Sequence, residues 1–290
     1  MYKVDNAVIM AAGTSSRFAP LSYERPKALI SVKGEVLIER QIRQLQEAGI
    51  NEIYIVTGYR NNDFEYLKEK CNVKIRHNDL YNVRNNHSSI YKVRDIIRNT
   101  YICSADNYFE TNPFTNEVEE AYYSALYANG DTKEWCLETD TNGYITDVKI
   151  GGSNAWYMLG HVFWDEEFSR KFLDILDREF PMEETKDKLW EDIYIEHINE
   201  LKMKIHKYDK NQIFEFDTLD ELREFDVSYV NNTRSYIIGQ ISKELKVLES
   251  DLTNFKCLKS DGNEAIGFEF MCNSIEYTYD YNKKKLEVKN

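Results

Sequence analysis

Short apolar runs alternate with amphipathic segments through the first hundred residues, and this alternation is the strongest constraint on the fold. Four runs of four or five residues suit buried strands, at 7–10, 53–57, 73–76 and 101–105. Three segments with helical features separate them, at 35–48, 63–70 and 89–97. This order predicts an α/β fold with three layers and a mostly parallel sheet. Ligands of such sheets bind outside the carboxyl ends of the strands.

The second half of the chain has a different pattern. Strand-like segments follow one another closely, at 121–127, 135–138, 145–150 and 156–164. Two helices, a strand and another helix are then expected, at 167–180, 189–201, 213–216 and 218–225. We interpret this half as an antiparallel extension of the sheet that carries one side of the binding pocket.

A domain boundary is expected near residue 230, so that 1–230 forms one domain and 231–290 a small α+β appendage. The appendage contains a helical pattern at 237–248 and strand patterns at 254–258, 267–272 and 275–281. So few residues hold only a marginal core. We therefore expect the appendage to pack on the main domain or to form a homodimer contact. Its removal is expected to leave the chemistry largely intact.

Charge and cysteine content narrow the partners and the compartment. The formal net charge is -13, from 50 acidic and 37 basic residues, which argues against nucleic acid or an anionic membrane as the main partner. The five cysteines are scattered without a CxxC pair, which favours reduced thiols over a disulfide framework or zinc site. No segment approaches the length of a membrane span, so the cytoplasm is the expected location.

The strongest motif follows the first strand. A loop of small and hydroxyl residues allows backbone N–H groups to approach an anion closely; its members are Ala11, Ala12, Gly13, Thr14, Ser15 and Ser16. Arg17 and Lys27, the latter in a PKAL sequence, supply the two cations that a triphosphate needs. The alternative is an ordinary strand-to-helix turn with a solvated arginine and lysine.

With these residues the chain resembles bacterial nucleotidyltransferases that carry the pattern AAGxGSRxxPLTxxxPKAL. Within that group it is most similar to the CTP:phosphocholine cytidylyltransferases of bacterial choline incorporation. The resemblance covers about residues 6–230 and continues through 58–70, 78–91, SADNY at 104–108, KEW at 133–135 and FEFDTLDEL at 214–222. Ser15 departs from the pattern, because it replaces the second glycine of the family's loop.

The resemblance implies that CTP and a small phosphorylated amino alcohol are joined with release of pyrophosphate. Asp106 lies at the end of the fourth strand and Asp217 just after a later one, and two such oxygen ligands suit Mg²⁺. Asp106 could instead be a turn residue, and Asp217 could be the cap of the helix at 218–225. Arg17 and Lys27 would hold the triphosphate and stabilise the leaving group.

Two further groups of residues are candidates for substrate contact. Asn85, Asn86 and Ser89 lie at the start of a helix and could bond the base and ribose, or the two asparagines could only cap that helix. The candidates for the acceptor are Trp135, Trp190, Glu191 and Asp192. Aromatic faces and a carboxylate suit a quaternary ammonium, and Trp135 matches the tryptophan that contacts choline in the family.

The acceptor assignment has alternatives. The family reads DLYWDN where this chain has DKLWED at 187–192, so a tyrosine is lost and Lys188 is added. Trp190 could simply be a core residue of an amphipathic helix. Phosphoethanolamine, 2-aminoethylphosphonate or a sugar phosphate could then replace phosphocholine.

The appendage carries a second, weaker resemblance. Residues 241–281 are similar to the opening of the N-lobe of choline and ethanolamine kinases, with 261–264 in the place of that family's GMTN-type loop. No kinase catalytic loop follows, so no kinase activity is expected. Two other functions stay open for the chain as a whole. A GT-A-like glycosyltransferase would release a nucleoside diphosphate, and a non-catalytic nucleotide-binding module would release nothing.

Overall fold

The computed structural model describes residues 1–260 and 265–289. The chain divides into two compact units. Unit 1 comprises residues 1–13 and 37–215, and unit 2 comprises residues 14–36 and 216–290. The kinase-like loop predicted at 261–264 lies outside the described residues. Along the chain no helix of the described part is long and apolar enough to cross a membrane.

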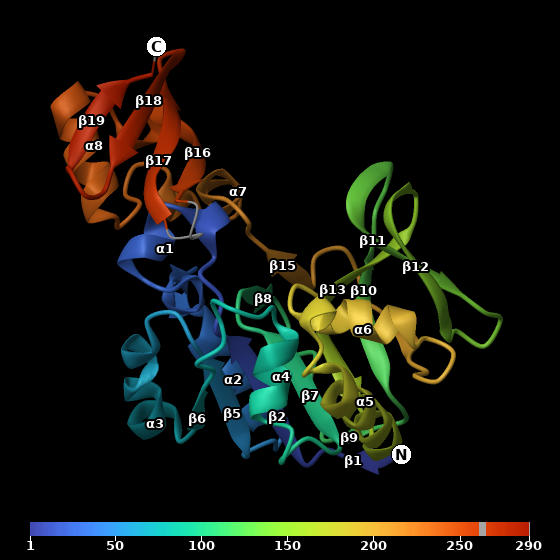
Figure 1. The fold of residues 1–290 in the computed structure, drawn as a ribbon. Helices are drawn as coiled ribbons and strands as arrows, with labels where there is room; N and C mark the ends of the chain where they lie inside the picture. Colours follow the sequence, from blue (N-terminus) through green and yellow to red (C-terminus); the bar gives the residue numbers. More distant parts are fainter. Residues whose placement is uncertain (261–264, 290) are drawn as a thin grey trace. The chain divides into compact units, whose positions relative to one another are not determined.

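A parallel sheet forms the centre of unit 1. Its four strands lie in the order β7-β2-β5-β6 and are β2 (Asn6–Ala11), β5 (Ile53–Thr57), β6 (Lys74–His77) and β7 (Thr100–Ser104). In the register of the sheet, Ala11 pairs with Thr57, and Met10 pairs with Ser104. The carboxyl ends of these strands therefore meet at one edge, as the sequence predicts (Figure 1).

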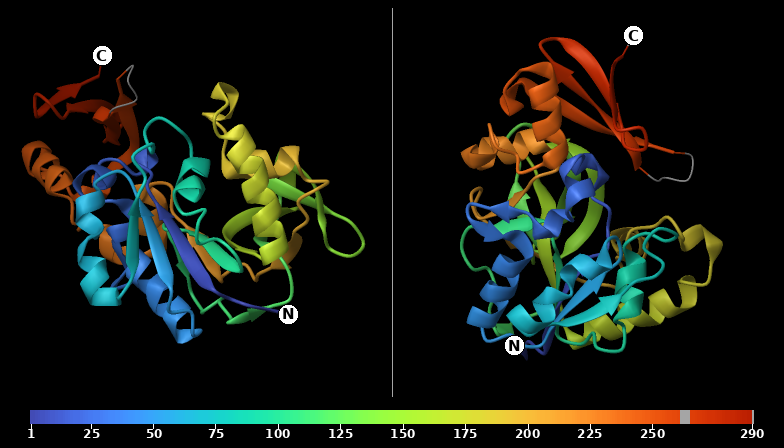
Figure 2. Two further views of the ribbon diagram at one scale, coloured as in Figure 1. Left: turned by 60° about the horizontal axis from the view of Figure 1, so that its bottom comes forward. Right: turned by 90° about the vertical axis from the view of Figure 1, so that its left-hand side faces the viewer.

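Helices cover both faces of this sheet. Val8, Val56 and Ile102 point into one core together with side chains of α4 (His87–Lys92) and α5 (Glu166–Glu179). Alternate residues of a strand point to opposite faces, and the other face is covered by α2 (Leu37–Glu47) and α3 (Tyr66–Cys71). Figure 2 shows α2 across the sheet from α4. The predicted three-layer α/β architecture is confirmed.

An antiparallel extension continues the sheet beyond β7. Strand β13 (Trp156–Trp164) pairs antiparallel with β7, so that Trp164 lies opposite Thr100. The extension also contains β10 (Tyr122–Tyr127), β11 (Asp131–Thr139), β12 (Ile145–Ser153) and β14 (Lys204–Lys207). Shorter elements of unit 1 are β1 (Tyr2–Lys3), η3 (Asn61–Phe64), β8 (Asn107–Phe109), β9 (Glu117–Val118), η4 (Glu183–Thr185) and β15 (Ile213–Glu215).

Two predicted helices extend well beyond the end of the observed ones. The helix predicted at 89–97 is α4, which begins at His87 and ends at Lys92, and turns follow it. Ile90, Val93 and Ile97 are all buried in one core, so their helical spacing continues after the helix has ended. The helix predicted at 189–201 is α6 (Trp190–Glu196), and it too is followed by turns.

Unit 2 combines a segment near the start of the chain with its last 75 residues. The first segment holds η1 (Ser16–Phe18), α1 (Leu21–Glu24), η2 (Lys27–Leu29), β3 (Ser31–Val32) and β4 (Glu35–Val36). The second holds α7 (Leu219–Phe225), η5 (Val227–Tyr229), α8 (Tyr236–Leu245), η6 (Glu249–Asp251) and strands β16 (Leu252–Lys259), β17 (Ala265–Cys272), β18 (Ile275–Asp280) and β19 (Lys285–Val288).

The four last strands form an antiparallel sheet in the order β16-β17-β18-β19. Its core is aromatic, because the rings of Phe255, Phe268 and Phe270 lie within 5.8 Å of one another. The predicted α+β character of the appendage agrees with this sheet and with α8. The predicted boundary near residue 230 stays a prediction, and the border between the two units falls after Glu215.

Candidate active site

The small-residue loop begins where β2 ends. Tyr59 donates its backbone N–H to the carbonyl oxygen of Ala12 at 3.0 Å, which ties the loop to the end of β5. Gly58 makes this approach feasible, because a Cβ there would lie 2.6 Å from Cβ of Tyr81 and 2.7 Å from the Ala12 oxygen. This role of Gly58 was not predicted, although an isolated glycine next to a strand is a signal of close backbone approach.

Ser15 has a left-handed backbone, with φ 47° and ψ 46°. This is the region that glycine adopts without a steric penalty, and the family pattern has glycine at this position. The residue is followed by η1, in which Phe18 N–H donates to the Ser15 carbonyl oxygen at 2.9 Å. The chain thus follows a path that suits glycine despite the serine.

Arg17 and Lys27, the two predicted cations, both belong to unit 2 but differ in exposure. Arg17 is 73% exposed at its side chain and forms an ion pair of 2.6 Å with Asp217. Lys27 is only 4% exposed, and its Nζ lies 5.6 Å from the centre of the Phe18 ring. Lys27 is the first residue of η2, so its side chain is packed inside unit 2 instead of extending into solvent.

Asp106 lies in the turn between β7 and β8, at the carboxyl edge of the parallel sheet. Helix α2 holds this turn, because Gln41 Nε2 donates to the carbonyl oxygens of Ser104 and Asn107 at 2.8 Å each. Arg40 Nε donates to the carbonyl oxygen of Phe109 at 2.8 Å. These supports were not predicted, because the two segments are more than 60 residues apart.

Asp217 follows β15 and precedes α7. Strand β15 pairs antiparallel with β8, and Glu215 lies opposite Asn107, the residue after Asp106. Asp217 is not the cap of α7. That cap is Thr218, whose hydroxyl accepts from Glu221 N–H, while the Glu221 carboxylate accepts from Thr218 N–H. The alternative role for Asp217 is therefore filled by its neighbour.

The donor chemistry of these two aspartates fits Mg²⁺. Magnesium takes one or two carboxylates, retains water and uses phosphate oxygens as its remaining ligands. A dedicated cage of three or more His, Cys, Asp or Glu side chains is absent among the described residues, and such a cage is not needed for an ion that arrives with a nucleotide.

Asn85, Asn86 and Ser89 have partners within unit 1. Asn86 accepts from the backbone N–H of Trp190 at 2.7 Å, and Asn85 donates to the carbonyl oxygen of Asp187 at 2.9 Å. Ser89 accepts from Asn78 at 3.1 Å. Neither asparagine caps α4 with its side chain. Asn86 ties the loop before that helix to the start of α6, and Asn85 ties it to the segment that precedes α6. Their contact with the base stays a prediction.

Glu191 is the most perturbed acid among the candidates. Its carboxylate accepts from Asn86 Nδ2 at 3.1 Å and from the Tyr123 hydroxyl at 3.3 Å. Burial raises its pKa to about 7, although these two hydrogen bonds act in the opposite direction. An acid with a pKa near neutrality at one end of a helix is a candidate for a functional group. Glu191 was predicted as a site residue and Tyr123 was not.

The two tryptophans differ in their surroundings. Trp135 lies on β11, opposite Ile150 of β12, and is partly buried. Trp190 is 1% exposed and packs edge-on against Trp164 at 5.2 Å, while Tyr123 stacks on it at 5.8 Å. In this structure Trp190 is a core residue. Next to it, Asp192 accepts from the backbone N–H of Leu189 at the start of α6. The acceptor contacts of all three residues stay predictions.

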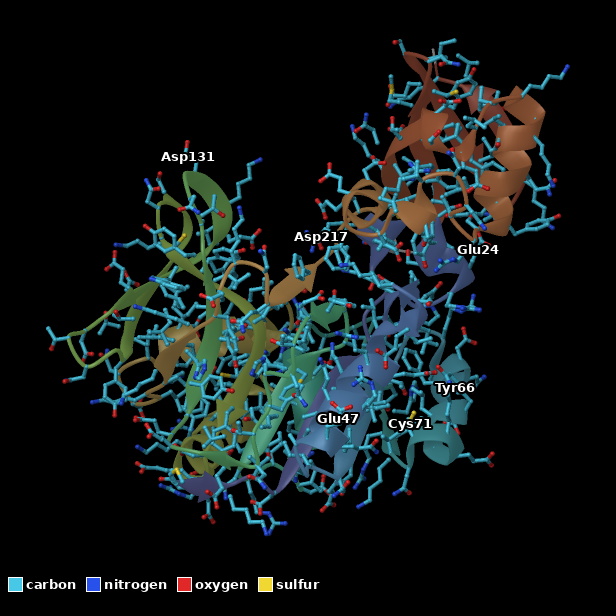
Figure 3. The ribbon with its side chains drawn as sticks, turned by 180° about the vertical axis from the view of Figure 1, so that it is seen from behind. Glu24, Glu47, Tyr66, Cys71, Asp131 and Asp217 are labelled. Carbon is cyan, nitrogen blue, oxygen red and sulfur yellow. The ribbon has the colours of Figure 1, made fainter. Side chains whose placement is uncertain are left out.

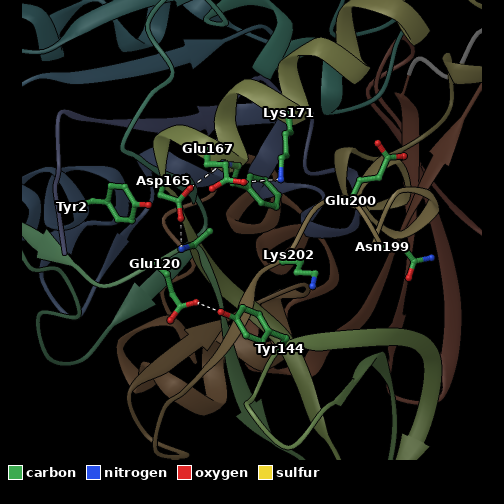
Figure 4. A pocket seen from close by; sticks show the side chains of 11 residues that line it. Tyr2, Glu120, Tyr144, Asp165, Glu167, Lys171, Asn199, Glu200 and Lys202 are labelled. Atoms are coloured by element: carbon green, nitrogen blue, oxygen red, sulfur yellow. Dashed lines mark hydrogen bonds and ion pairs between the residues drawn. The ribbon is translucent and has the colours of Figure 1, made fainter.

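A pocket of about 520 Å³ lies at the opposite edge of the sheet, away from the carboxyl ends of the parallel strands (Figure 4). Asp165 on its wall follows β13, whose last residue pairs with the first residue of β7. Two of its acids form ion pairs: Glu167 pairs with Lys171, which also lines the pocket, and Glu120 pairs with Lys204, which does not. No predicted site residue lines this pocket.

Comparison with known proteins agrees with this geometry. Residues 7–122 match the model of the MobA-like NTP transferase domain. The chain is 34% identical over 220 residues to the choline-phosphate cytidylyltransferase of Streptococcus pneumoniae, which covers 76% of this chain and 96% of that protein. It is also 34% identical over 234 residues to the 2-aminoethylphosphonate cytidylyltransferase of Lancefieldella rimae, covering 79% and 95% of the two chains.

A solved structure shows the same fold. The CTP:phosphocholine cytidylyltransferase from Streptococcus pneumoniae superposes with a TM-score of 0.74 and 34% identity. The superposition covers 77% of this chain and 97% of that one. The relatives are therefore matched over almost their whole length, while about a quarter of this chain has no counterpart in the match.

Proposed function

We propose that this chain, which belongs to the choline-phosphate cytidylyltransferase family, transfers a cytidylyl group from CTP to phosphocholine and releases pyrophosphate. The observation that carries the proposal is the 34% identity that spans nearly the whole length of a choline-phosphate cytidylyltransferase. Gly13, Arg17, Lys27, Asp106 and Asp217 all lie within the segments that resemble the family.

The reaction requires no covalent intermediate on the protein. A phosphate oxygen of phosphocholine attacks the α-phosphorus of CTP, and the bond from that phosphorus to the bridging oxygen of the β-phosphate breaks. The products are CDP-choline and pyrophosphate. Positioning and charge neutralisation are the main means of catalysis in phosphoryl-type transfer. In our proposal Lys27 and Arg17 bind the triphosphate and stabilise the charge that develops on the leaving pyrophosphate.

Asp106 and Asp217 are the residues that would hold Mg²⁺. When bound, the ion would neutralise phosphate charge and orient the reacting oxygens. Asp217 now pairs with Arg17, so nucleotide binding would exchange one exposed ion pair for two interactions with the substrate. An exposed pair contributes only about 0–1 kcal/mol, and its loss is easily offset by contacts with a triphosphate and its metal.

The acceptor is the finer part of the proposal. Trp135 and the carboxylate of Glu191 suit the trimethylammonium group of phosphocholine. The similarity to a 2-aminoethylphosphonate cytidylyltransferase supports a second candidate, in which a primary ammonium donates hydrogen bonds to Glu191 instead. We also propose a cytoplasmic location, because all five cysteines are free thiols.

The test is pyrophosphate release by the full chain with Mg²⁺, in a panel of four nucleoside triphosphates against four acceptors. The acceptors are phosphocholine, phosphoethanolamine, 2-aminoethylphosphonate and glucose 1-phosphate. We expect turnover with CTP and the highest kcat/KM with phosphocholine. Highest kcat/KM with 2-aminoethylphosphonate would select the second candidate. Release of a nucleoside diphosphate from a nucleotide sugar would indicate a glycosyltransferase, and binding of CTP without turnover would indicate a binding module.

A further inference from the structure

The segment that carries both predicted cations packs with the end of the chain. Residues 14–36 belong to the same compact unit as residues 216–290. The elements of this segment are very short, since α1 has four residues and η1 and η2 have three each. Isolated helices of this length are unstable in water. The order of the segment must therefore come from what packs against it.

Glu24, the last residue of α1, makes the most specific of these contacts. Its carboxylate accepts from the backbone N–H of Tyr236 at 2.7 Å and of Ile237 at 3.2 Å, and from the Ser235 hydroxyl. These donors form the first turn of the ten-residue helix α8. A carboxylate there satisfies N–H groups that have no partner within the helix and interacts favourably with the helix dipole. Figure 3 labels Glu24.

Tyr23 extends the same contact to the last sheet. Its ring lies 4.1 Å from the ring of Tyr281, just after β18, and its hydroxyl lies 4.0 Å from the sulfur of Cys257 on β16. Strand β16 also packs against η1, the element that contains Arg17. The appendage thus touches the segment on both sides of Pro20.

Helix α7, which directly follows Asp217, is bound to the appendage as well. Arg223 donates to the carbonyl oxygens of Leu252 and Glu249, each at 2.7 Å. Asp220 accepts from the backbone N–H of Asn254 at 2.8 Å. The appendage therefore holds two elements at once, one with Arg17 and Lys27 and one beside Asp217.

We infer that the appendage formed by residues 231–290 positions the triphosphate-binding segment, and that Glu24 is the positioning residue through which it acts. The expected consequence of this positioning is tight binding of CTP, and this consequence rests on the proposed function. A segment that is already ordered loses less conformational entropy when the nucleotide binds. This inference differs from the expectation that the appendage can be removed without affecting the chemistry, and that expectation stays a prediction.

The test uses point variants of the full chain. Glu24→Ala removes all three contacts with α8, whereas Glu24→Gln retains one oxygen acceptor. Tyr281→Leu removes the ring that packs against Tyr23 and provides an independent perturbation. Glu244→Gln is the matched control, because Glu244 is an exposed acid on the same helix.

We expect Glu24→Ala to raise the KM for CTP at least tenfold and to change the KM for the acceptor less than twofold. Glu24→Gln should have an intermediate effect, and Tyr281→Leu should shift the KM for CTP in the same direction. If the appendage matters only for global stability, Glu24→Ala should lower the Tm and the active fraction but leave the KM for CTP as it is in Glu244→Gln. That result would overturn the inference.

A second measurement does not depend on turnover. The amides of Phe18 and Ile30 donate to carbonyl oxygens within the segment, so their hydrogen exchange reports its order. Glu24→Ala should accelerate exchange across residues 14–36 at least tenfold relative to Glu244→Gln. Unchanged exchange there would refute the positioning role even if the wild type proved to have another activity. Faster exchange in a chain without cytidylyl transfer would refute only the proposed function.

Discussion

Replacement of Glu191 by glutamine should separate the charge of this side chain from its hydrogen bonds. A glutamine oxygen can still accept from Asn86 and from the Tyr123 hydroxyl, which now lie 3.1 Å and 3.3 Å from the carboxylate oxygens. The variant cannot ionise. Because burial raises the pKa of Glu191 to about 7, the wild-type side chain changes its charge within the range of an ordinary assay, and the variant does not.

The direction and size of the effect follow from this pKa. At pH 8 about nine-tenths of the carboxyl is ionised, and at pH 6 about one-tenth. If only the carboxylate attracts the cationic end of phosphocholine, the KM for phosphocholine should rise about tenfold from pH 8 to pH 6. The KM for CTP should change much less. In Glu191→Gln the KM for phosphocholine should be high at both values and nearly independent of pH.

Stability gives an independent check of the same group. A carboxyl whose pKa is raised in the folded protein binds protons more tightly there than in the unfolded chain. The contribution of Glu191 to the free energy of unfolding is therefore greatest below about pH 4.5 and is lost as the pH rises through 7. The difference is on the order of 3 kcal/mol. Glu191→Gln should thus be more stable than the wild type at pH 8, and of similar stability at pH 4.5, in urea unfolding.

The phosphate of phosphocholine ionises near pH 6 as well, and the variant controls for this. A pH dependence shared by wild type and Glu191→Gln belongs to the substrate. The reasoning fails if the two profiles of KM coincide, or if the variant is less stable than the wild type at pH 8. Either result would mean that Glu191 is ionised throughout this range or lies away from the acceptor.

Three further substitutions test other parts of the proposed site. Asp106→Asn should lower kcat for pyrophosphate release about a hundredfold or more; a folded variant within a few-fold of the wild type would exclude the ligand role. Trp135→Ala should raise the KM for phosphocholine about tenfold, or about 1.4 kcal/mol, and equal losses for CTP would make it a core residue. Ser15→Gly should raise the free energy of unfolding by about 0.5–1 kcal/mol by relieving its left-handed backbone, and a lower Tm would contradict this.

The sequence predicts the parallel sheet well because its signals are local. The strand at 53–57 is found at the predicted residues, and the small-residue loop follows β2 as expected. The prediction of a helix at 89–97 is wrong after Lys92, where α4 ends. Val93 and Ile97 are buried outside the helix, and their burial produces an apolar spacing that resembles that of a helix. Strand β8 was missed, since three residues carry no recognisable period.

The hydrogen bonds that hold the candidate site residues could not be predicted from the sequence, for a different reason. Asn86 and Glu191 are 105 residues apart, and Glu24 and Ser235 are 211 apart. Neither pair has a spacing that a pattern could reveal, and both form only once the backbone is folded. Residue types alone therefore identify candidates for chemistry, while the residues that hold them must be found by packing.

Two features make the triphosphate-binding segment unfavourable by itself. Ser15 occupies a backbone region that is unfavourable for a residue with a Cβ, and the surrounding helices are too short to be stable alone. Residues of the second half of the chain support this segment, through the helix N-terminus that Glu24 completes and the Tyr281 ring that packs against Tyr23. Because the segment depends on these contacts for its order, small changes in the contacts should change that order and, with it, the affinity for CTP.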